Sequence, residues 1–169
     1  TFGIAVNATD ILLNSIVSSD TVNIDNILPI VTDGAISIAS TGSGTGGTYL
    51  PGDNLIVQWD DTVDSNGLEV VLATTNFSKM GGGETVAMAD DGSTCGDASA
   101  GDNIYRACYT ISGSYASTYD VALTVTDNAG NTAAADDTTG IVIDTIAPTV
   151  TDGAIDIISA GSGTAGTYI

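Results

Sequence analysis

One stretch of this chain occurs twice. Residues 24–49 read IDNILPIVTDGAISIASTGSGTGGTY, and residues 143–168 read IDTIAPTVTDGAIDIISAGSGTAGTY. The two copies agree at 19 of 26 positions, at an offset of 119 residues. Self-similarity at a fixed spacing is the sequence signature of proteins built from repeated structural units. The 169-residue chain is therefore expected to hold parts of a tandem array.

A second, shorter match lies at the start of the chain. Residues 3–10 (GIAVNATD) align with residues 120–127 (DVALTVTD) at an offset of 117. The two matches divide the chain into the end of one repeat at 1–25, a complete repeat at 26–144 and the opening of a third repeat at 145–169. The two partial copies would lack everything equivalent to residues 51–117, so they are not expected to complete one domain between them. We interpret the chain as a segment of a longer polymer of domains.

The composition favours strands and turns. Val, Ile, Thr and Tyr favour strands, and they alternate with clusters of Gly, Ser, Asn and Asp, which are typical of turns. The usual helix formers Glu, Lys, Arg and Leu are scarce. Short strands are predicted in the complete repeat at residues 30–38, 54–59, 68–74, 84–88, 104–111, 119–126 and 141–143. Seven short strands in a repeat of this size predict an all-β fold, an immunoglobulin-like β-sandwich, with Trp59 in its core.

Two motifs resemble the repeats of a known family. Residues 125–132 (VTDNAGNT), followed by residues 143–148 (IDTIAP), resemble the closing signature of bacterial immunoglobulin-like domains. Residues 47–53 (GTYLPGD) resemble their opening. Such tandem repeats occur in large surface adhesins and in extracellular filament or stalk proteins. The resemblance implies a structural or adhesive role, often with calcium stiffening the array, although the acidic insertion at residues 89–103 departs from the family's short pattern.

The charge of the chain has one sign. The sequence has 21 Asp and Glu residues against Lys79 and Arg106, which gives a formal net charge of −19. Nucleic acid is not an expected partner, because binding it requires cations that neutralise phosphates. An anionic membrane surface is disfavoured for the same reason. No run of about 18 apolar residues is present, so no membrane insertion is expected in this segment.

The aspartates are expected to gather at one end of the sandwich. Strands run up and down alternately, so the incoming linker meets the loops that follow the second, fourth and sixth strands. These segments carry Asp25, Asp60, Asp61, Asp64, Asp90, Asp91, Asp97, Asp102, Asp127, Asp136 and Asp137. Like charges so concentrated repel one another unless they are paired or screened.

A calcium site is predicted where the linker enters the repeat. Ca²⁺ takes about 6–8 oxygen ligands, and carboxylates are the ligands it prefers. The candidate ligands are Asp25, Asp60, Asp61, Asp64, Asp127 and Asn131. A solvated acidic rim without metal is the alternative interpretation.

Cys95 and Cys108 are the only cysteines. An even count in a chain of this class predicts a disulfide and an oxidising compartment, hence a secreted or cell-surface protein. Two free buried thiols are the alternative. The bond would restrain the acidic insertion. Asn7-Ala8-Thr9 and Asn76-Phe77-Ser78 match the N-glycosylation pattern, and whether they are glycosylated is left open.

Catalysis finds no support in the sequence. The chain has no His for a catalytic triad or a zinc site. The Gly-rich segment at residues 42–47 lacks the Lys and the helix of a phosphate-binding loop, so it is predicted to be a flexible connection. We therefore expect no enzyme but a structural module of a stalk, filament or surface layer, with neighbouring repeats, and other copies in a filament or lattice, as partners. The alternative is an adhesin repeat that itself binds a glycan or a partner surface.

Overall fold

The computed structural model describes residues 2–66 and 70–156. Strands make up 45% of it and helix 12%, so the fold is all-β. The strands are β1 (Phe2–Thr9), β2 (Ser15–Val22), β3 (Ile36–Ile38), β4 (Asn54–Asp60), β5 (Val70–Asn76), β6 (Val86–Ala87), β7 (Ile104–Thr110), β8 (Ala116–Asp127) and β9 (Thr132–Asp144). The helical turns are α1 (Asp61–Asp64) and the 3₁₀ helices η1 (Asp33–Ala35), η2 (Thr45–Gly47), η4 (Ser78–Met80), η5 (Thr94–Gly96) and η6 (Asp152–Ala154).

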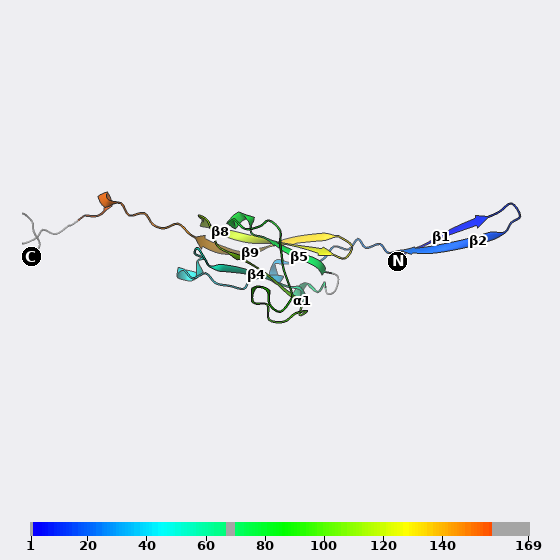
Figure 1. Ribbon diagram of the computed structural model, residues 1–169, viewed down its shortest axis with the longest axis horizontal. Helices are drawn as coiled ribbons and strands as arrows, with labels where there is room; N and C mark the ends of the chain where they lie inside the picture. Colours follow the sequence, from blue (N-terminus) through cyan, green and yellow to red (C-terminus); the bar gives the residue numbers. More distant parts are fainter. Residues whose placement is uncertain (1, 67–69, 157–169) are drawn as a thin grey trace, which may run out of the picture.

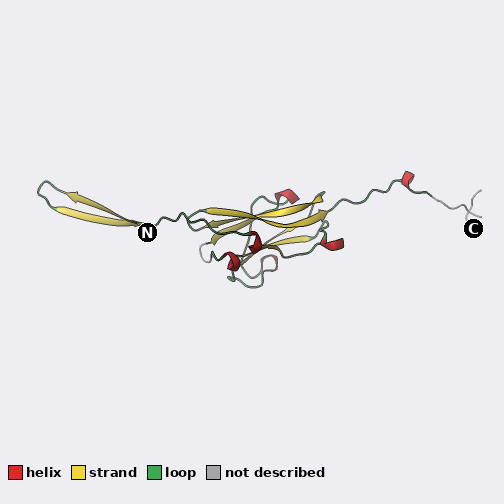
Figure 2. Ribbon diagram, turned by 180° about the vertical axis from the view of Figure 1, so that it is seen from behind, coloured by secondary structure: helices red, strands yellow, loops and turns green. Residues whose placement is uncertain are grey.

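The strands form three antiparallel sheets. The first is the hairpin β1–β2, the second has the order β3-β4-β7, and the third has the order β6-β5-β8-β9. Strands β3 to β9 make up a central body (Figure 1). The hairpin lies beyond one end of this body, and the chain after β9 leaves at the other end (Figures 1 and 2).

The core of the body lies between its two sheets. Side chains of a strand alternate between its faces, and in β4 the side chains of Leu55, Val57 and Trp59 are fully buried. In β8 the buried set includes Val121 and Leu123. All five belong to one hydrophobic cluster. Burying a side chain of this size stabilises a fold by about 1.5–3 kcal/mol, so this alternation is what holds the two sheets together.

The predicted strands all have counterparts, but four of them differ clearly in length. The sixth, predicted at 119–126, is extended to Ala116–Asp127. The first is shortened to β3, because the residues before it form the 3₁₀ helix η1. The fourth is reduced to β6. The last, predicted at 141–143, is extended to Thr132–Asp144, because it pairs along most of β8. Asp136 and Asp137, predicted in a loop, therefore lie in β9. The predicted start of the third strand, at residue 68, lies outside the described residues.

From Ile4 to Thr9 the hairpin β1–β2 repeats the register that β8 and β9 have from Val121 to Thr126. Its closing pair, Thr9 with Ser15, corresponds at an offset of 117 to Thr126 with Thr132. Its side chains differ in burial, since Ile4 is 55% exposed whereas its counterpart in β8, Val121, is 1% exposed. The hairpin thus resembles β8–β9 in local structure but lacks the sheet that covers the corresponding face of β8 in the body.

The segment after β9 repeats the entry to the body. The 3₁₀ helix η6 lies 119 residues after η1 and has the same three-residue sequence, Asp-Gly-Ala. By analogy with the strand predicted at residues 30–38, the repetition of the sequence predicts a strand at residues 150–158. Residues 155 and 156 are not in a strand, and residues 157 and 158 lie outside the described residues.

The Gly-rich connection at residues 42–47 is held in place by hydrogen bonds rather than loose. The amide of Gly42 donates to the carbonyl of Gly47 at 3.1 Å, and the amide of Ser43 donates to the carboxylate of Asp53 at 2.8 Å. A Cβ atom at Gly42 would lie 2.2 Å from the carbonyl oxygen of Thr48, so only glycine fits there. The recurrence of this segment at residues 161–166 lies outside the described residues.

Candidate functional site

The residues predicted as calcium ligands lie where the chain enters the body. Two of them, Asp61 and Asp64, are in α1, and Asp60 comes directly before it. Asp60 caps this helix by accepting a hydrogen bond from the amide of Thr62 at 3.0 Å. Asp61 is 1% exposed, and one of its carboxylate oxygens accepts hydrogen bonds from the amide and the side chain of Asn66, at 3.0 and 2.7 Å. Both carboxylates therefore stabilise the turn around α1.

Asp64 connects the core to the incoming linker. Its carboxylate accepts a hydrogen bond from the indole nitrogen of Trp59 at 2.8 Å. It also accepts hydrogen bonds from Thr32, from the amide at 3.1 Å and from the hydroxyl at 2.6 Å. Asp64 is 6% exposed, so this buried charge is compensated by three donors.

Asp127 and Asn131 build the loop between β8 and β9. Asp127 accepts hydrogen bonds from the amides of Ala129 and Asn131 at 2.8 Å, and from the Asn131 side chain at 2.9 Å. The side-chain bond is the main cause that holds the pKa of Asp127 below its ordinary value. The Asn131 amide also reaches the linker, donating to the carbonyl of Ile27 at 3.1 Å. The carboxylate of Asp25 is engaged in its own turn, accepting from the amide of Ile27 at 3.0 Å.

The structure does not gather the predicted ligands around one point. Within residues 2–66 and 70–156, no three carboxylates of the predicted set have oxygens within 4.8 Å of one another. The reason is that the oxygens already accept hydrogen bonds, some from amides nearby in the sequence and others from the linker. Sequence spacing placed these side chains at the correct end of the body but could not say which way each one turns.

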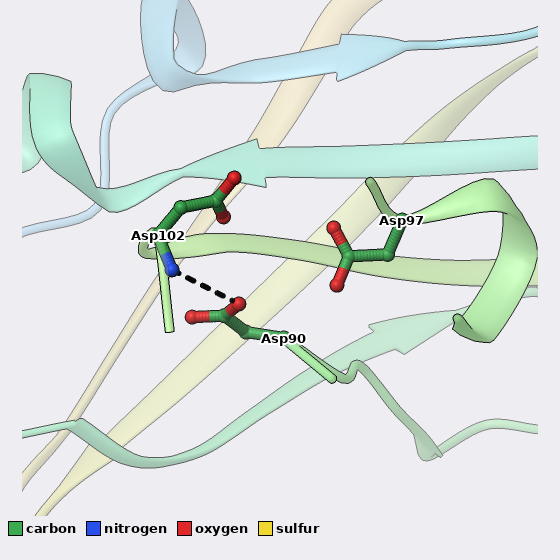
Figure 3. Close-up of side chains that lie close together, drawn as sticks. All are labelled: Asp90, Asp97 and Asp102. Atoms are coloured by element: carbon green, nitrogen blue, oxygen red, sulfur yellow. Dashed lines mark hydrogen bonds between the residues drawn. The ribbon is translucent and has the colours of Figure 1, made fainter. Parts of the chain in front are cut away.

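Three other aspartates do converge. Asp90, Asp97 and Asp102 each place one carboxylate oxygen within 4.8 Å of the others (Figure 3). Asp97 is 6% exposed, and the other two are half-buried. Oxygens that bind one Ca²⁺ lie about 2.3–2.6 Å from the ion, so those on opposite sides of it are separated by roughly 5 Å. The three carboxylates thus suit a hard cation whose remaining ligands would be carbonyls or water.

The loop that carries this cluster, between β6 and β7, is folded by its own carboxylates. Asp90 accepts hydrogen bonds from the amides of Gly101 at 2.7 Å and Asn103 at 2.9 Å, and so joins the two ends of the loop. The amide of Asp102 also donates to it, at 3.3 Å (Figure 3). Asp97 accepts from the amide of Gly92 at 2.6 Å. The insertion is therefore held by its own hydrogen bonds.

Two further connections attach the loop to β7. A disulfide joins Cys95 in the loop to Cys108 in the strand, with the sulfur atoms 2.10 Å apart. Arg106 donates to the carbonyl of Gly96 and, from Nε at 3.0 Å and Nη2 at 2.7 Å, to the side-chain oxygen of Gln58. One of the two cationic residues of the chain is therefore used to hold this loop against the sheet.

The acidic loop lies beside α1. The amide of Asp61 donates to the carbonyl of Asn103 at 2.9 Å. Burial raises the pKa of Tyr105, and the charges of Asp90 and Asp61 raise it further. The predicted concentration of negative charge at this end of the body is thus present, although its tightest cluster is in the insertion. The sequence signal for that cluster was the run Asp90-Asp91-Gly92, which looks like ordinary turn chemistry.

The two predicted glycosylation positions differ in setting. Asn7 is exposed on β1, and Asn76 ends β5, where its side-chain oxygen accepts a hydrogen bond from the amide of Ser78 at 2.8 Å.

Among the described residues, no helix has the length and the apolar character needed to cross a bilayer. Comparison with protein-family models, with curated proteins and with solved structures gives no match.

Proposed function

We propose that this chain is a segment of an extracellular tandem-repeat protein whose immunoglobulin-like repeats serve as a stalk, filament or surface-layer module. The observation that carries the proposal is the recurrence of structure with sequence. From Ile4 to Asp20 the hairpin β1–β2 has the register and loop of β8–β9, and η6 has the place and sequence of η1. Partial copies of one unit therefore flank a complete one.

The sheet order supports the immunoglobulin-like assignment. Strands β3 to β9 form a three-stranded and a four-stranded antiparallel sheet around one core. Seven strands in two such sheets, with the last two joined as a hairpin, are the architecture of this class of sandwich. Fold alone does not define activity, so the structural role rests on the repetition and on the path of the chain.

The path of the chain supports an end-to-end array. The linker enters the body at the end where the loop between β8 and β9 lies, and the chain leaves at the opposite end (Figure 1). The hairpin exposes Phe2, Ile4 and Val6 by 55–63%, and each is a large apolar side chain. In the array the rest of the preceding repeat covers this face, as the three-stranded sheet covers the corresponding face of β8.

The compartment and the metal complete the proposal. The disulfide Cys95–Cys108 suits an oxidising environment outside the cell. Calcium, in this proposal, binds at the acidic end of the repeat and relieves the repulsion among its carboxylates. The ligands with supporting geometry are Asp90, Asp97 and Asp102, rather than the set around Asp25.

Electron microscopy of the native full-length protein tests this function. We expect thin, extended particles with a regular axial repeat, isolated as stalks or bundled as filaments or lattices. A compact particle without an axial repeat would contradict the structural role. A regular array whose individual repeats bind glycan would instead favour the adhesin alternative.

A further inference from the structure

We propose that the entrance end of each repeat is a binding surface for the extended peptide that leaves the preceding repeat, and that both repeats hold this one linker at the same time. The inference rests on the proposed tandem array and adds what joins its units. Two independent views of the linker carry it. Residues 25–33 show how a linker is bound by the repeat ahead of it, and residues 144–146 show how it is bound by the repeat behind it.

The repeat ahead binds the linker through two asparagines. The side chain of Asn131 donates to the backbone carbonyl of Ile27 at 3.1 Å and to the backbone carbonyl of Asp25 at 3.5 Å. The side chain of Asn66 pairs with the backbone of Ile30, accepting from its amide and donating to its carbonyl, both at 2.7 Å. A primary amide that satisfies both backbone groups of one residue recognises extended peptide regardless of its side chains.

Two carboxylate–threonine pairs continue the same contact. Asp64 of the repeat accepts hydrogen bonds from the amide and the hydroxyl of Thr32 in the linker, at 3.1 and 2.6 Å. Asp33 of the linker accepts the amide and hydroxyl of Thr138 in β9, at 2.8 and 3.0 Å. The linker is thus bonded to the body at intervals along its whole length from residue 25 to residue 33.

The repeat behind binds the linker through different atoms. The amide of Asp144 donates to the carbonyl of Tyr49 at 3.0 Å, and the amide of Thr145 donates to the carbonyl of Tyr115 at 2.8 Å. The Thr145 hydroxyl accepts from the amide of Tyr115 at 2.7 Å and donates to the carbonyl of Gly113 at 2.9 Å. The repeat behind therefore engages the amides of residues 144 and 145 and the hydroxyl of Thr145.

The two views superimpose at the offset of 119 residues. Asp25 corresponds to Asp144, and Ile27 corresponds to Ile146. In both copies the aspartate accepts a hydrogen bond from the amide two residues on, at 3.0 Å. The turn that begins at this aspartate is therefore the same, whether the linker is held from ahead or from behind.

The two sets of bonds use different linker atoms. The repeat ahead donates to the carbonyls of Asp25 and Ile27, which correspond to Asp144 and Ile146. The repeat behind accepts hydrogen bonds from the amides of Asp144 and Thr145. Because the atoms differ, both sets can form together, and the bonds to the repeat ahead then begin at the same residues where the bonds to the repeat behind end. The asparagine that contacts the linker first, Asn131, has a counterpart in the hairpin β1–β2. The Asn14 side chain donates to Asp10 at 2.9 Å, as the Asn131 side chain donates to Asp127.

Amide hydrogen exchange measured by NMR tests the proposal. The whole 169-residue chain is compared with the same chain lengthened after Ile169 by a copy of residues 51–144, which completes the next repeat. In the shorter chain we expect slow exchange at Thr145 and fast exchange at Thr149 and Thr151, the counterparts of Ile30 and Thr32. In the longer chain we expect all three to exchange slowly, Thr149 and Thr151 at least tenfold more slowly than before.

Variants in the added repeat identify the cause. Replacing the copy of Asn66 by Ala should return Thr149 to fast exchange and leave Thr145 slow. The matched control replaces the copy of Asn54, which is exposed at the start of β4, and should change neither. A chelator should leave the protection of Thr149 unchanged.

Three outcomes would overturn the inference. Loss of protection at Thr145 when Thr149 gains it would mean that the two sets of bonds exclude each other. Fast exchange at Thr149 beside a folded added repeat, recognised by its slow core amides, would mean that the entrance does not bind the linker. Protection of Thr149 that disappears with chelator would assign the junction to a metal. An added repeat that does not fold would contradict the proposed array itself.

Discussion

Asp64 shows how one side chain serves both the core and the linker. It accepts hydrogen bonds from the buried indole of Trp59 and from Thr32, and these groups are 5 and 32 residues away in sequence. Leaving a buried donor without a partner costs about 1–3 kcal/mol. The carboxylate is therefore expected to matter more for stability than for metal binding.

We expect Asp64→Ala to lower the free energy of unfolding by about 2–3 kcal/mol, because the donors of Trp59 and Thr32 lose their acceptor. Urea denaturation followed by the fluorescence of Trp59, the single tryptophan, measures this directly. The control Asp120→Ala, at an exposed position in β8, should shift the value by less than about 0.5 kcal/mol. Equal effects of the two substitutions would contradict the role given to Asp64.

Gly130 shows a backbone requirement that the two hairpin loops meet differently. Its φ is 88°, in the left-handed region, and its counterpart Leu13 has a φ of 67°. A side chain in this region costs about 1–2 kcal/mol. Glycine meets the requirement without strain in the complete repeat, and leucine meets it with strain in the partial one.

Gly130→Ala should therefore destabilise the complete repeat by about 1–2 kcal/mol in the same urea titration. A Cβ atom at Gly130 would meet nothing within 4 Å, so the effect can come only from the backbone. Gly34→Ala is the matched control, because its Cβ also meets nothing but its φ is not positive. It should be neutral or slightly stabilising, and a loss as large as that of Gly130→Ala would refute the explanation.

At the scale of elements, the loop that joins β8 to β9 contains a carboxylate, Asp127, whose ionisation is linked to the stability of the fold. Asn131 lowers the pKa of Asp127 below its ordinary value of 3.8 by donating to the ionised carboxylate. A depressed pKa in the folded state stabilises the fold above about pH 4, and this contribution is lost as the pH falls through the lower folded-state value. The loop should therefore contribute to the acid sensitivity of the repeat.

Asn131→Ala should reduce that acid sensitivity. We expect the melting temperature of the variant to lie below that of the parent near pH 6, and the two curves to approach each other below about pH 4. Thermal unfolding followed by circular dichroism across this pH range measures the difference. The difference is informative because the repulsion from a net charge of −19 is common to both proteins. A constant gap between the curves would show that the bond does not act through ionisation.

At the scale of the whole molecule, the negative charge and the incoming linker lie at the same end of the body. α1, the insertion between β6 and β7, and the incoming linker lie together there. Their carboxylates fold the loops by accepting amide hydrogens, and three of them also converge. An ion at that point would add to a junction that already holds the linker by hydrogen bonds.

Calcium should raise the melting temperature of the 169-residue chain relative to chelator at matched ionic strength, because a ligand of the folded state stabilises it by mass action. At 100 times the dissociation constant the gain is about 2.7 kcal/mol. Asp97→Asn should abolish the increment, and Asp25→Asn should preserve it, because only Asp97 belongs to the converging cluster. If calcium does not raise the melting temperature of the parent protein, the carboxylates form a solvated acidic rim without metal. If the Asp25 variant loses the rise, the ligands are those predicted from the sequence.

The sequence by itself determined the features that depend on neighbours along the chain. The repeat offset, the alternation that buries Leu55 and Val57, and the turn at Asp25 and Asp144 are properties of short segments. The 3₁₀ helix η6 keeps the form of η1 although it follows the body instead of packing on it (Figure 1). Such structure forms from local hydrogen bonds and dihedral preferences, so it can be predicted from residues in order.

Only the tertiary structure decided which distant groups meet. The sequence placed eleven aspartates at one end of the body, but the packing of the insertion against β7 selected Asp90, Asp97 and Asp102 as a cluster. The length of β9 likewise follows from its pairing with β8, not from the weak strand preference of its alanines. The physical reason is that a carboxylate turns toward whichever donors surround it in space, and several of those donors lie more than 30 residues away in the chain.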